Sequence, residues 1–188
     1  ATVTEGASVG TVTKRVGETG VNLANLQIST ATQDGKVERV TLYNSGTASA
    51  SDFANVNIQY NNNKIADGVW DGKYVSFDLT SCGDDCKIAK GNNKNYAVYG
   101  DVLNGTTRNM NLDVKRTSHV LVKELNTNVY VLPTNSASAM TNTVQVGAGT
   151  LNITKVNNVA AGNVPEAANG VELGSWNLLF NLDTPNSH

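Results

Sequence analysis

The stretch Gly20-Val21-Asn22-Leu23-Ala24-Asn25-Leu26-Gln27-Ile28 alternates apolar and polar residues. An alternation of period two is typical of a β-strand with one buried face. The same pattern returns near the end of the chain as Gly170-Val171-Glu172-Leu173-Gly174-Ser175-Trp176-Asn177-Leu178. Each copy follows a Thr- and Val-rich alternating segment, Thr11–Val16 in one case and Thr150–Val156 in the other. The chain is therefore expected to hold one full module and the opening strands of a second.

The opening strands of a module cannot bury their apolar face without a partner. Two isolated strands are only marginally stable in water. The nearest candidate for the partner is another copy of the same chain. We therefore expect two domains, a β-sandwich module over residues 1–135 and a C-terminal strand extension over residues 136–188.

The composition favours strands and turns and argues against a nucleic-acid binder. Charged residues make up only 16% of the 188 residues, and Asn, Thr, Ser and Gly replace them. The net charge of −2 is unlike the basic surface that nucleic acids require. No apolar run approaches the roughly 20 residues that cross a bilayer. The chain begins at Ala1 without a signal segment, as we expect of a mature secreted protein.

Three dipeptides predict tight β-hairpins in the first module. They are Asp34-Gly35, Asp71-Gly72 and Asn104-Gly105, each between two alternating segments. These dipeptides supply the positive φ angles of two-residue hairpin turns. With strands at short, regular intervals and no helical periodicity, the sequence predicts an all-β, antiparallel sandwich of two sheets.

Few residues suggest chemistry. Cys82 and Cys86 are the two cysteines, and we expect them to form a disulfide that stiffens a loop in an oxidising compartment. Asn104-Gly105-Thr106 and Asn152-Ile153-Thr154 match the N-glycosylation sequon, which makes Asn104 and Asn152 candidate glycan sites. No nucleophile–base signature is present, so we expect no enzyme, no catalytic residue, no cofactor and no metal site.

Several segments resemble a repeat module of secreted bacterial and archaeal surface, S-layer-like and fibre proteins. The resemblance covers roughly residues 8–132. It rests on Gly20–Ile28, on Val37–Ala48, on Val75–Leu79 and on Ile88–Tyr99. Such modules imply an immunoglobulin-like sandwich that serves display, spacing or assembly outside the cell, and they carry no catalytic residues.

The leading hypothesis is an extracellular structural subunit that polymerises head to tail by strand complementation. Strands within residues 141–156 and 171–182 would complete the sheet of a neighbouring copy. Six apolar residues at alternating positions would fill the neighbour's groove, with Trp176 as the anchor. They are Leu151, Ile153, Leu173, Trp176, Leu178 and Phe180. The N-terminal segment Thr2–Val12 is an alternative exchanged strand.

Two other functions remain open from the sequence. A cell-surface adhesin or carbohydrate-binding module would use Tyr43, Tyr60 and Tyr74 to contact cell-surface glycans. A fragment of a longer tandem-repeat surface protein would also end in an unfinished module.

Overall fold

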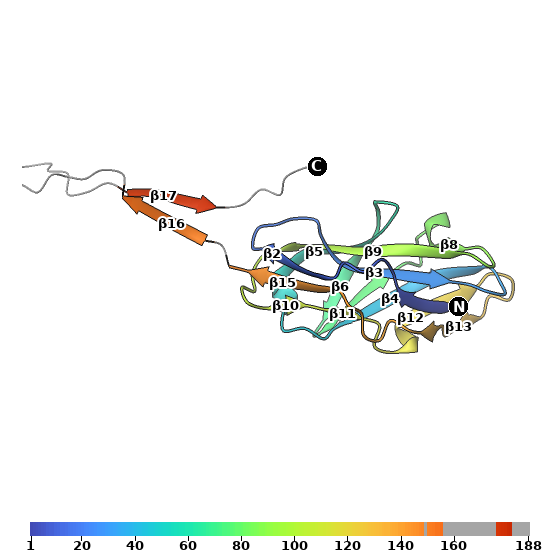
Figure 1. Ribbon diagram of the computed structural model, residues 1–188. Helices are drawn as coiled ribbons and strands as arrows, with labels where there is room; N and C mark the ends of the chain where they lie inside the picture. Colours follow the sequence, from blue (N-terminus) through green and yellow to red (C-terminus); the bar gives the residue numbers. More distant parts are fainter. Residues whose placement is uncertain (149, 156–175, 182–188) are drawn as a thin grey trace, which may run out of the picture. The chain divides into compact units, whose positions relative to one another are not determined.

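The computed structural model describes residues 1–148, 150–155 and 176–181. These residues are all-β, and their only helical segments are three short 3-10 turns, Ala50–Asp52, Asp84–Cys86 and Thr117–His119. The chain divides into two units, Ala1–Gly147 and Ala148–His188, which are described separately (Figure 1). The prediction of an all-β protein is thus confirmed.

The first unit is built on one large sheet, whose first part contains the strand that opens with Val21. In spatial order this part runs β14, β1, β3, β9, β5 and the beginning of β6. A shift of register between Asn22 and Ala24 places both Leu23 and Ala24 in the core, as expected of a β-bulge. The bounds are β1 Thr2–Glu5, β3 Val21–Ser29, β5 Phe53–Tyr60, β6 Asn63–Asp71, β9 Asn93–Val102 and β14 Thr134–Asn135.

The second part of the sheet continues from the end of β6 through β7, β4 and β12 to the edge strand β13. The short strands β8 and β11 pair with the two ends of β4. The bounds are β4 Gly35–Asn44, β7 Tyr74–Asp78, β8 Lys87–Ile88, β11 Leu112–Asp113, β12 Val120–Glu124 and β13 Tyr130–Val131.

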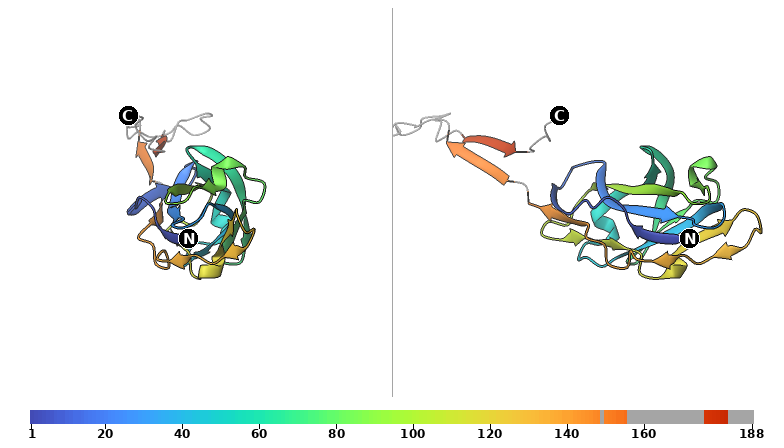
Figure 2. Two further views of the ribbon diagram at one scale, coloured as in Figure 1. Left: turned by 90° about the vertical axis from the view of Figure 1, so that its right-hand side faces the viewer. Right: turned by 45° about the vertical axis from the view of Figure 1, so that its right-hand side comes forward.

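Strand β6 joins the two parts because it changes partner halfway along. It pairs with β5 as far as Asp67 and with β7 from Gly68 onward. A Cβ at Gly68 would lie 2.7 Å from Val75 Cγ2 and 2.9 Å from Phe77 Cε1, so only glycine fits this crossing point. The sheet consequently curls around a common interior (Figure 2).

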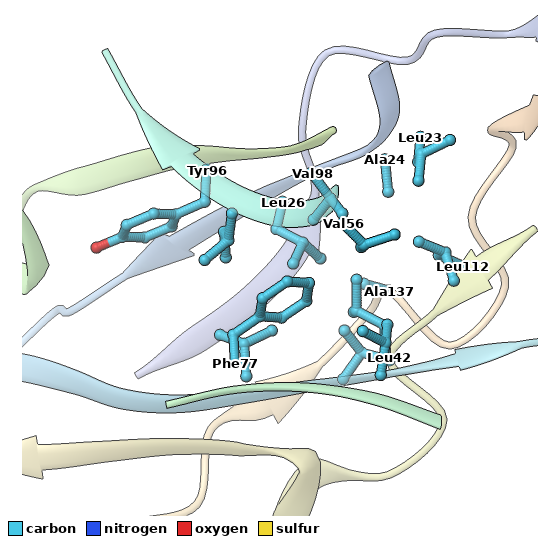
Figure 3. Packing of buried hydrophobic residues seen from close by; sticks show 14 of the residues in the cluster. Leu23, Ala24, Leu26, Leu42, Val56, Phe77, Tyr96, Val98, Leu112 and Ala137 are labelled. Atoms are coloured by element: carbon cyan, nitrogen blue, oxygen red, sulfur yellow. The ribbon is translucent and has the colours of Figure 1, made fainter. Parts of the chain in front are cut away.

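The core fills the concave side of this curled sheet. Leu26, Tyr96 and Val98 from β3 and β9 face Leu42 and Phe77 from β4 and β7 (Figure 3). All five are almost completely excluded from solvent. Along β4 and β7 the buried Val40, Leu42, Val75 and Phe77 alternate with more exposed residues.

A smaller sheet contains β2 (Thr11–Arg15), β10 (Asn109–Met110) and β15 (Thr143–Gly147), in the order β10, β15, β2. Strand β15 runs parallel to β2, and β14 runs parallel to β1. The prediction of a purely antiparallel sandwich is therefore wrong in this respect. The last strands of the unit lie alongside its first strands rather than returning through hairpins.

One of the three predicted hairpins is confirmed. Asp71-Gly72 connects β6 to β7, and Gly72 has a φ of +58°. Asp34-Gly35 forms no hairpin, because β3 pairs with β1 and β9 whereas β4 pairs with β7 and β12. Asn104-Gly105 forms none either, since it leads from β9 to β10, which pairs with β15. In both failures the strands on either side of the turn belong to different parts of the unit.

The boundary between the units lies after Gly147, later in the chain than the expected boundary after residue 135. The reason is that β15 pairs with β2 and β10 and buries Val144 and Val146 in the first unit. The described part of the second unit is a two-stranded sheet of β16 (Thr150–Lys155) and β17 (Trp176–Asn181). In the first unit, by contrast, β2 does not pair with β3, so the two supposed copies differ.

Candidate functional site

The second unit offers a β-hairpin whose strands pair only with each other among the described residues. Strands β16 and β17 are antiparallel from Thr150↔Asn181 to Lys155↔Trp176. Every residue of β16 has a partner in β17, so the ladder is regular and each strand keeps one edge free of any described partner. A free edge is a row of unpaired N–H and C=O groups that can accept a further strand.

The apolar residues predicted to contact a neighbour occupy facing positions of this ladder. Leu151 is opposite Phe180, and Ile153 is opposite Leu178. Trp176 is 59% exposed. The predicted contact residue Leu173 lies outside the described residues. The structure therefore places five of the six predicted residues in one hairpin and leaves the Trp176 indole largely in solvent.

The first unit carries an exposed apolar edge at β13. Val129, Tyr130 and Leu132 are 57%, 54% and 60% exposed. Strand β13 pairs with β12 through only two residues, Val122↔Val131 and Lys123↔Tyr130, and no described strand covers its other edge. An apolar, uncovered edge strand is a predicted site of strand addition.

The β13 edge is held in place by polar contacts behind it. The Tyr130 hydroxyl donates a 2.7 Å hydrogen bond to Glu38 Oε2 on β4, and this bond to the carboxylate raises the pKa of Tyr130. A tight turn fixes the preceding residues, because Glu124 N donates to Val129 O and Asn128 adopts a φ of +58°. The edge is therefore preorganised.

Sequence reasoning did not single out this edge. The sequence pattern that could have indicated it is the run Val129-Tyr130-Val131-Leu132. These four apolar residues do not alternate with polar ones, and they directly follow the turn at Asn126–Asn128. A continuous apolar run is expected for a strand that is buried on both faces. Here the run lies at a sheet edge, which is where a missing partner strand would fit.

The edge of the smaller sheet is less apolar. Strand β2 pairs with β15 on one side and with no described strand on the other. Its residues are Thr11, Val12, Thr13, Lys14 and Arg15. The positively charged end of β2 is the kind of edge that resists pairing with another chain. Strand β13 is therefore the better acceptor.

The disulfide between Cys82 and Cys86 is confirmed, with a Cα–Cα distance of 5.7 Å. It closes the loop after β7, and hydrogen bonds from Lys94 on β9 hold this loop in place. Lys94 Nζ donates to the carbonyls of Asp84 at 2.7 Å and Asp85 at 3.0 Å, and the same ammonium lies 4.3 Å from the ring centre of Tyr60. Tyr60 is thus part of a structural contact.

The first candidate glycan site, Asn104, is exposed in the connection between β9 and β10. Its backbone N–H donates to the carbonyl of Asp52, which holds the connection against the 3-10 turn Ala50–Asp52. The second site, Asn152, pairs with Leu179 within the hairpin. A glycan is sterically permitted at Asn104 because the side chain faces solvent.

No family model matches the chain, and neither does any curated protein. Among the described residues no helix is long and apolar enough to cross a membrane. The same part of the chain contains no group of three or more His, Cys, Asp or Glu residues that could hold a metal ion.

Two of the three tyrosines predicted for glycan contact lie together on the outer face of the sheet. Tyr43 on β4 and Tyr74 on β7 are cross-strand partners with ring centres 5.0 Å apart. His119 lies edge-on to Tyr74 at 5.5 Å. Tyr60 belongs to the separate contact with Lys94. The structure therefore brings Tyr43 and Tyr74 together but not Tyr60.

Proposed function

We propose that this protein is an extracellular structural subunit that assembles with copies of itself, head to tail, into a filament or surface layer. One observation carries the proposal. The hairpin β16–β17 forms a sheet of its own, outside the sheets of the first unit, and Trp176 in it is 59% exposed. Such a hairpin is marginally stable alone and gains stability by joining a larger sheet.

The hairpin is the donor in this proposal. Its backbone edge would extend the sheet of a neighbouring copy, so that main-chain hydrogen bonds supply the ladder. Trp176 would supply the anchor, since aromatic residues that become buried dominate the energetics of interfaces. The other apolar positions, Leu151, Ile153, Leu178 and Phe180, would pack against the same neighbour.

The acceptor is the edge of β13 with Val129, Tyr130 and Leu132. Exposed apolar residues of this density are unusual on a free surface and typical of an interaction site. Ala1 and Val131 line one small pocket, so this edge lies at the same end of the unit as the N-terminus. The acceptor is built into the first unit and does not require the hairpin of its own chain.

The two ends of the first unit are different, as a head-to-tail contact requires. Residues 1–15 and 134–147 run side by side in the same direction, from Thr2↔Thr134 to Arg15↔Gly147. The acceptor end near Ala1 and the exit at Gly147 are therefore at opposite ends of this paired run. A contact between unlike surfaces that does not close into a ring generates a filament.

The remaining features support a role outside the cell. The Cys82–Cys86 disulfide is expected to persist in an oxidising compartment. In this proposal the first unit acts as an immunoglobulin-like sandwich module, with the β3–β9–β5 and β7–β4–β12 strands as its two layers. The module would provide spacing, and the second unit would provide connection.

A complementation experiment with the full chain tests the proposal. Trp176→Ser removes the donor anchor, and the double change Val129→Lys/Leu132→Lys places charges on the acceptor edge. Each variant alone should stay monomeric in sedimentation velocity, because each has only one working surface. An equimolar mixture should form dimers and stop there, since one donor and one acceptor remain.

Leu103→Lys is the matched control, because Leu103 is an exposed apolar residue in the connection after β9, far from β13 in the order of the strands. This variant should assemble like the unmodified chain. Polymers formed by either interface variant alone, or the absence of a dimer in the mixture, would contradict the proposal.

A further inference from the structure

The outer face of the β4–β7 strand pair carries a cluster of aromatic rings beside exposed cations. Tyr43, Tyr74 and His119 are half-buried and form a continuous row of ring contacts at 5.0 Å and 5.5 Å. Lys115 Nζ lies 3.8 Å from the centre of the Tyr43 ring. A cation–π contact of this kind holds a flexible lysine in one position.

Two arginines complete the cluster. Arg116 is exposed next to Lys115, and Arg39 on β4 donates to the carbonyl of Ser118 at 3.3 Å. Within the described residues, neither these arginines nor Lys115 forms a salt bridge, whereas Arg108 and Lys64 do. The cluster thus gathers three cations that are not in salt bridges with any described residue, in a chain whose net charge is −2.

The described carboxylates around the cluster form no salt bridge with its cations. Asp113, opposite Tyr43, is buried and accepts hydrogen bonds from Ser45 Oγ and Met140 N. Asp78, opposite Arg39, accepts from the N–H and hydroxyl of Thr80. Asp71 is exposed opposite Tyr74 and forms the acidic border of the cluster toward β6.

The positive charges of Arg116, Arg39 and Lys115 all act on His119. Burial lowers the pKa of His119, and the charges of Arg116, Arg39 and Lys115 lower it further. The imidazole is therefore neutral at physiological pH and contributes an uncharged ring to the row. Its Nδ1 atom is buried and has no hydrogen-bond partner among the described residues.

We propose that this cluster is a binding site for an acidic polysaccharide, with Tyr43, Tyr74 and His119 contacting the sugar rings and Lys115, Arg116 and Arg39 pairing with the carboxylates. Aromatic rings pack against the C–H faces of pyranoses, and arginine binds carboxylates through paired N–H groups. The site extends over two strands and a turn, so it would contact a few sugar units. It is independent of the self-assembly proposed above.

A single-stranded nucleic acid is a less suitable ligand for this cluster. Bases stack on open, flat ring faces. The rings of Tyr43 and Tyr74 are tilted by 52° to each other, and Lys115 covers one face of Tyr43. A sugar unit can contact a single ring without stacking between two, and its carboxylate can meet the Lys115 ammonium where it already lies.

The test measures binding of the full chain to polygalacturonate by isothermal titration calorimetry, with dextran and a single-stranded DNA oligonucleotide as comparison ligands. Lys115→Met/Arg116→Gln changes two exposed residues and should weaken polygalacturonate binding about tenfold at moderate salt. Lys87→Gln/Lys90→Gln removes the same charge at two other exposed positions, in β8 and just after it, and should change binding by less than about twofold. Sedimentation and unfolding measurements establish that all proteins compared share one assembly and folding state.

Preference for polygalacturonate over both comparison ligands, lost only in Lys115→Met/Arg116→Gln, supports the proposal. Three results would overturn it: no binding of polygalacturonate, equal losses in the two double variants, or equally tight binding of the oligonucleotide. The second result would mean that net charge alone attracts the polyanion.

Discussion

Asp52 is one of the few acidic residues inside the first unit, and it organises the connection between β4 and β5. Its carboxylate accepts from Ser49 N at 2.7 Å and Ser49 Oγ at 2.9 Å, and it pairs with Arg108 at 2.9 Å. We predict that Asp52→Ala lowers the free energy of unfolding by about 2 kcal/mol, because charge-assisted hydrogen bonds to a buried group are lost. Urea denaturation measures this loss.

The exposed pair Lys64–Asp67 provides the control for this prediction. Both side chains are more than half exposed, so Asp67→Ala should change the free energy of unfolding by less than about 0.5 kcal/mol. Equal effects of the two substitutions would contradict the role assigned to Asp52.

The contribution of Asp52 should depend on pH. Burial raises the pKa of Asp52, but the hydrogen bonds from Ser49 and the charge of Arg108 outweigh burial and hold the pKa below its usual 3.8. The folded state therefore binds this proton more weakly than the unfolded state, and the stabilisation is complete above pH 3.8. We predict that the stability difference between the unmodified chain and Asp52→Ala shrinks as the pH falls through the folded-state pKa. A difference that stays constant down to pH 2 would refute this.

Gly68 carries the change of partner in β6. A methyl group there would meet Val75 and Phe77, both fully buried, and the carbonyl of Val56 at 3.2 Å. Gly68→Ala should therefore destabilise the first unit by about 2 kcal/mol through overpacking. The neighbouring Val69→Thr, at an exposed position, should leave the urea midpoint almost unchanged.

At the scale of elements, the sequence predicted what is encoded locally. Asp71-Gly72 joins strands that are consecutive and adjacent, so turn residues and alternation were enough. Asp34-Gly35 has the same turn chemistry, but Gly35 is packed against Val122 and Thr30 side chains. The contact with Val122 comes from far along the chain, and no local pattern records it.

The parallel pairs β1–β14 and β2–β15 were beyond sequence reasoning for a related reason. They join residues more than 130 positions apart, for example Thr2 with Thr134 and Thr11 with Thr143. Such pairing depends on the whole topology of the unit. The candidate site shows the same division: local alternation predicted strands in the region of β16 and β17, whereas the exposed edge at β13 depends on which strands lie beside it.

The position of β15 leads to a prediction about truncation. Removing residues 148–188 should leave the free energy of unfolding of the first unit unchanged, because β15 and its pairing are retained. Removing residues 136–188 also deletes the buried Ala137, Met140, Val144 and Val146, which should cost roughly 6 kcal/mol of apolar burial and unfold the unit. Circular dichroism and urea denaturation of the two truncated chains check this. A stable chain ending at residue 135 would show that β15 is dispensable.

At the scale of the whole molecule, the proposal assigns the acceptor edge to the first unit and the donor hairpin to the second. The first unit buries its own core and presents an exposed apolar edge at β13. The second provides a hairpin that has no described partner beyond its own two strands. Joining these surfaces between copies would bury Trp176 and Leu132, which otherwise remain in water.

Negative-stain electron microscopy of the full chain, beside the chain ending at Gly147, tests this central claim most directly. Both proteins are imaged at the same high concentration, and the truncated chain is first confirmed to be folded. The account predicts filaments or layers from the full chain and uniform small particles from the truncated chain. Uniform particles from the full chain, or polymers from the chain without its hairpin, would contradict it.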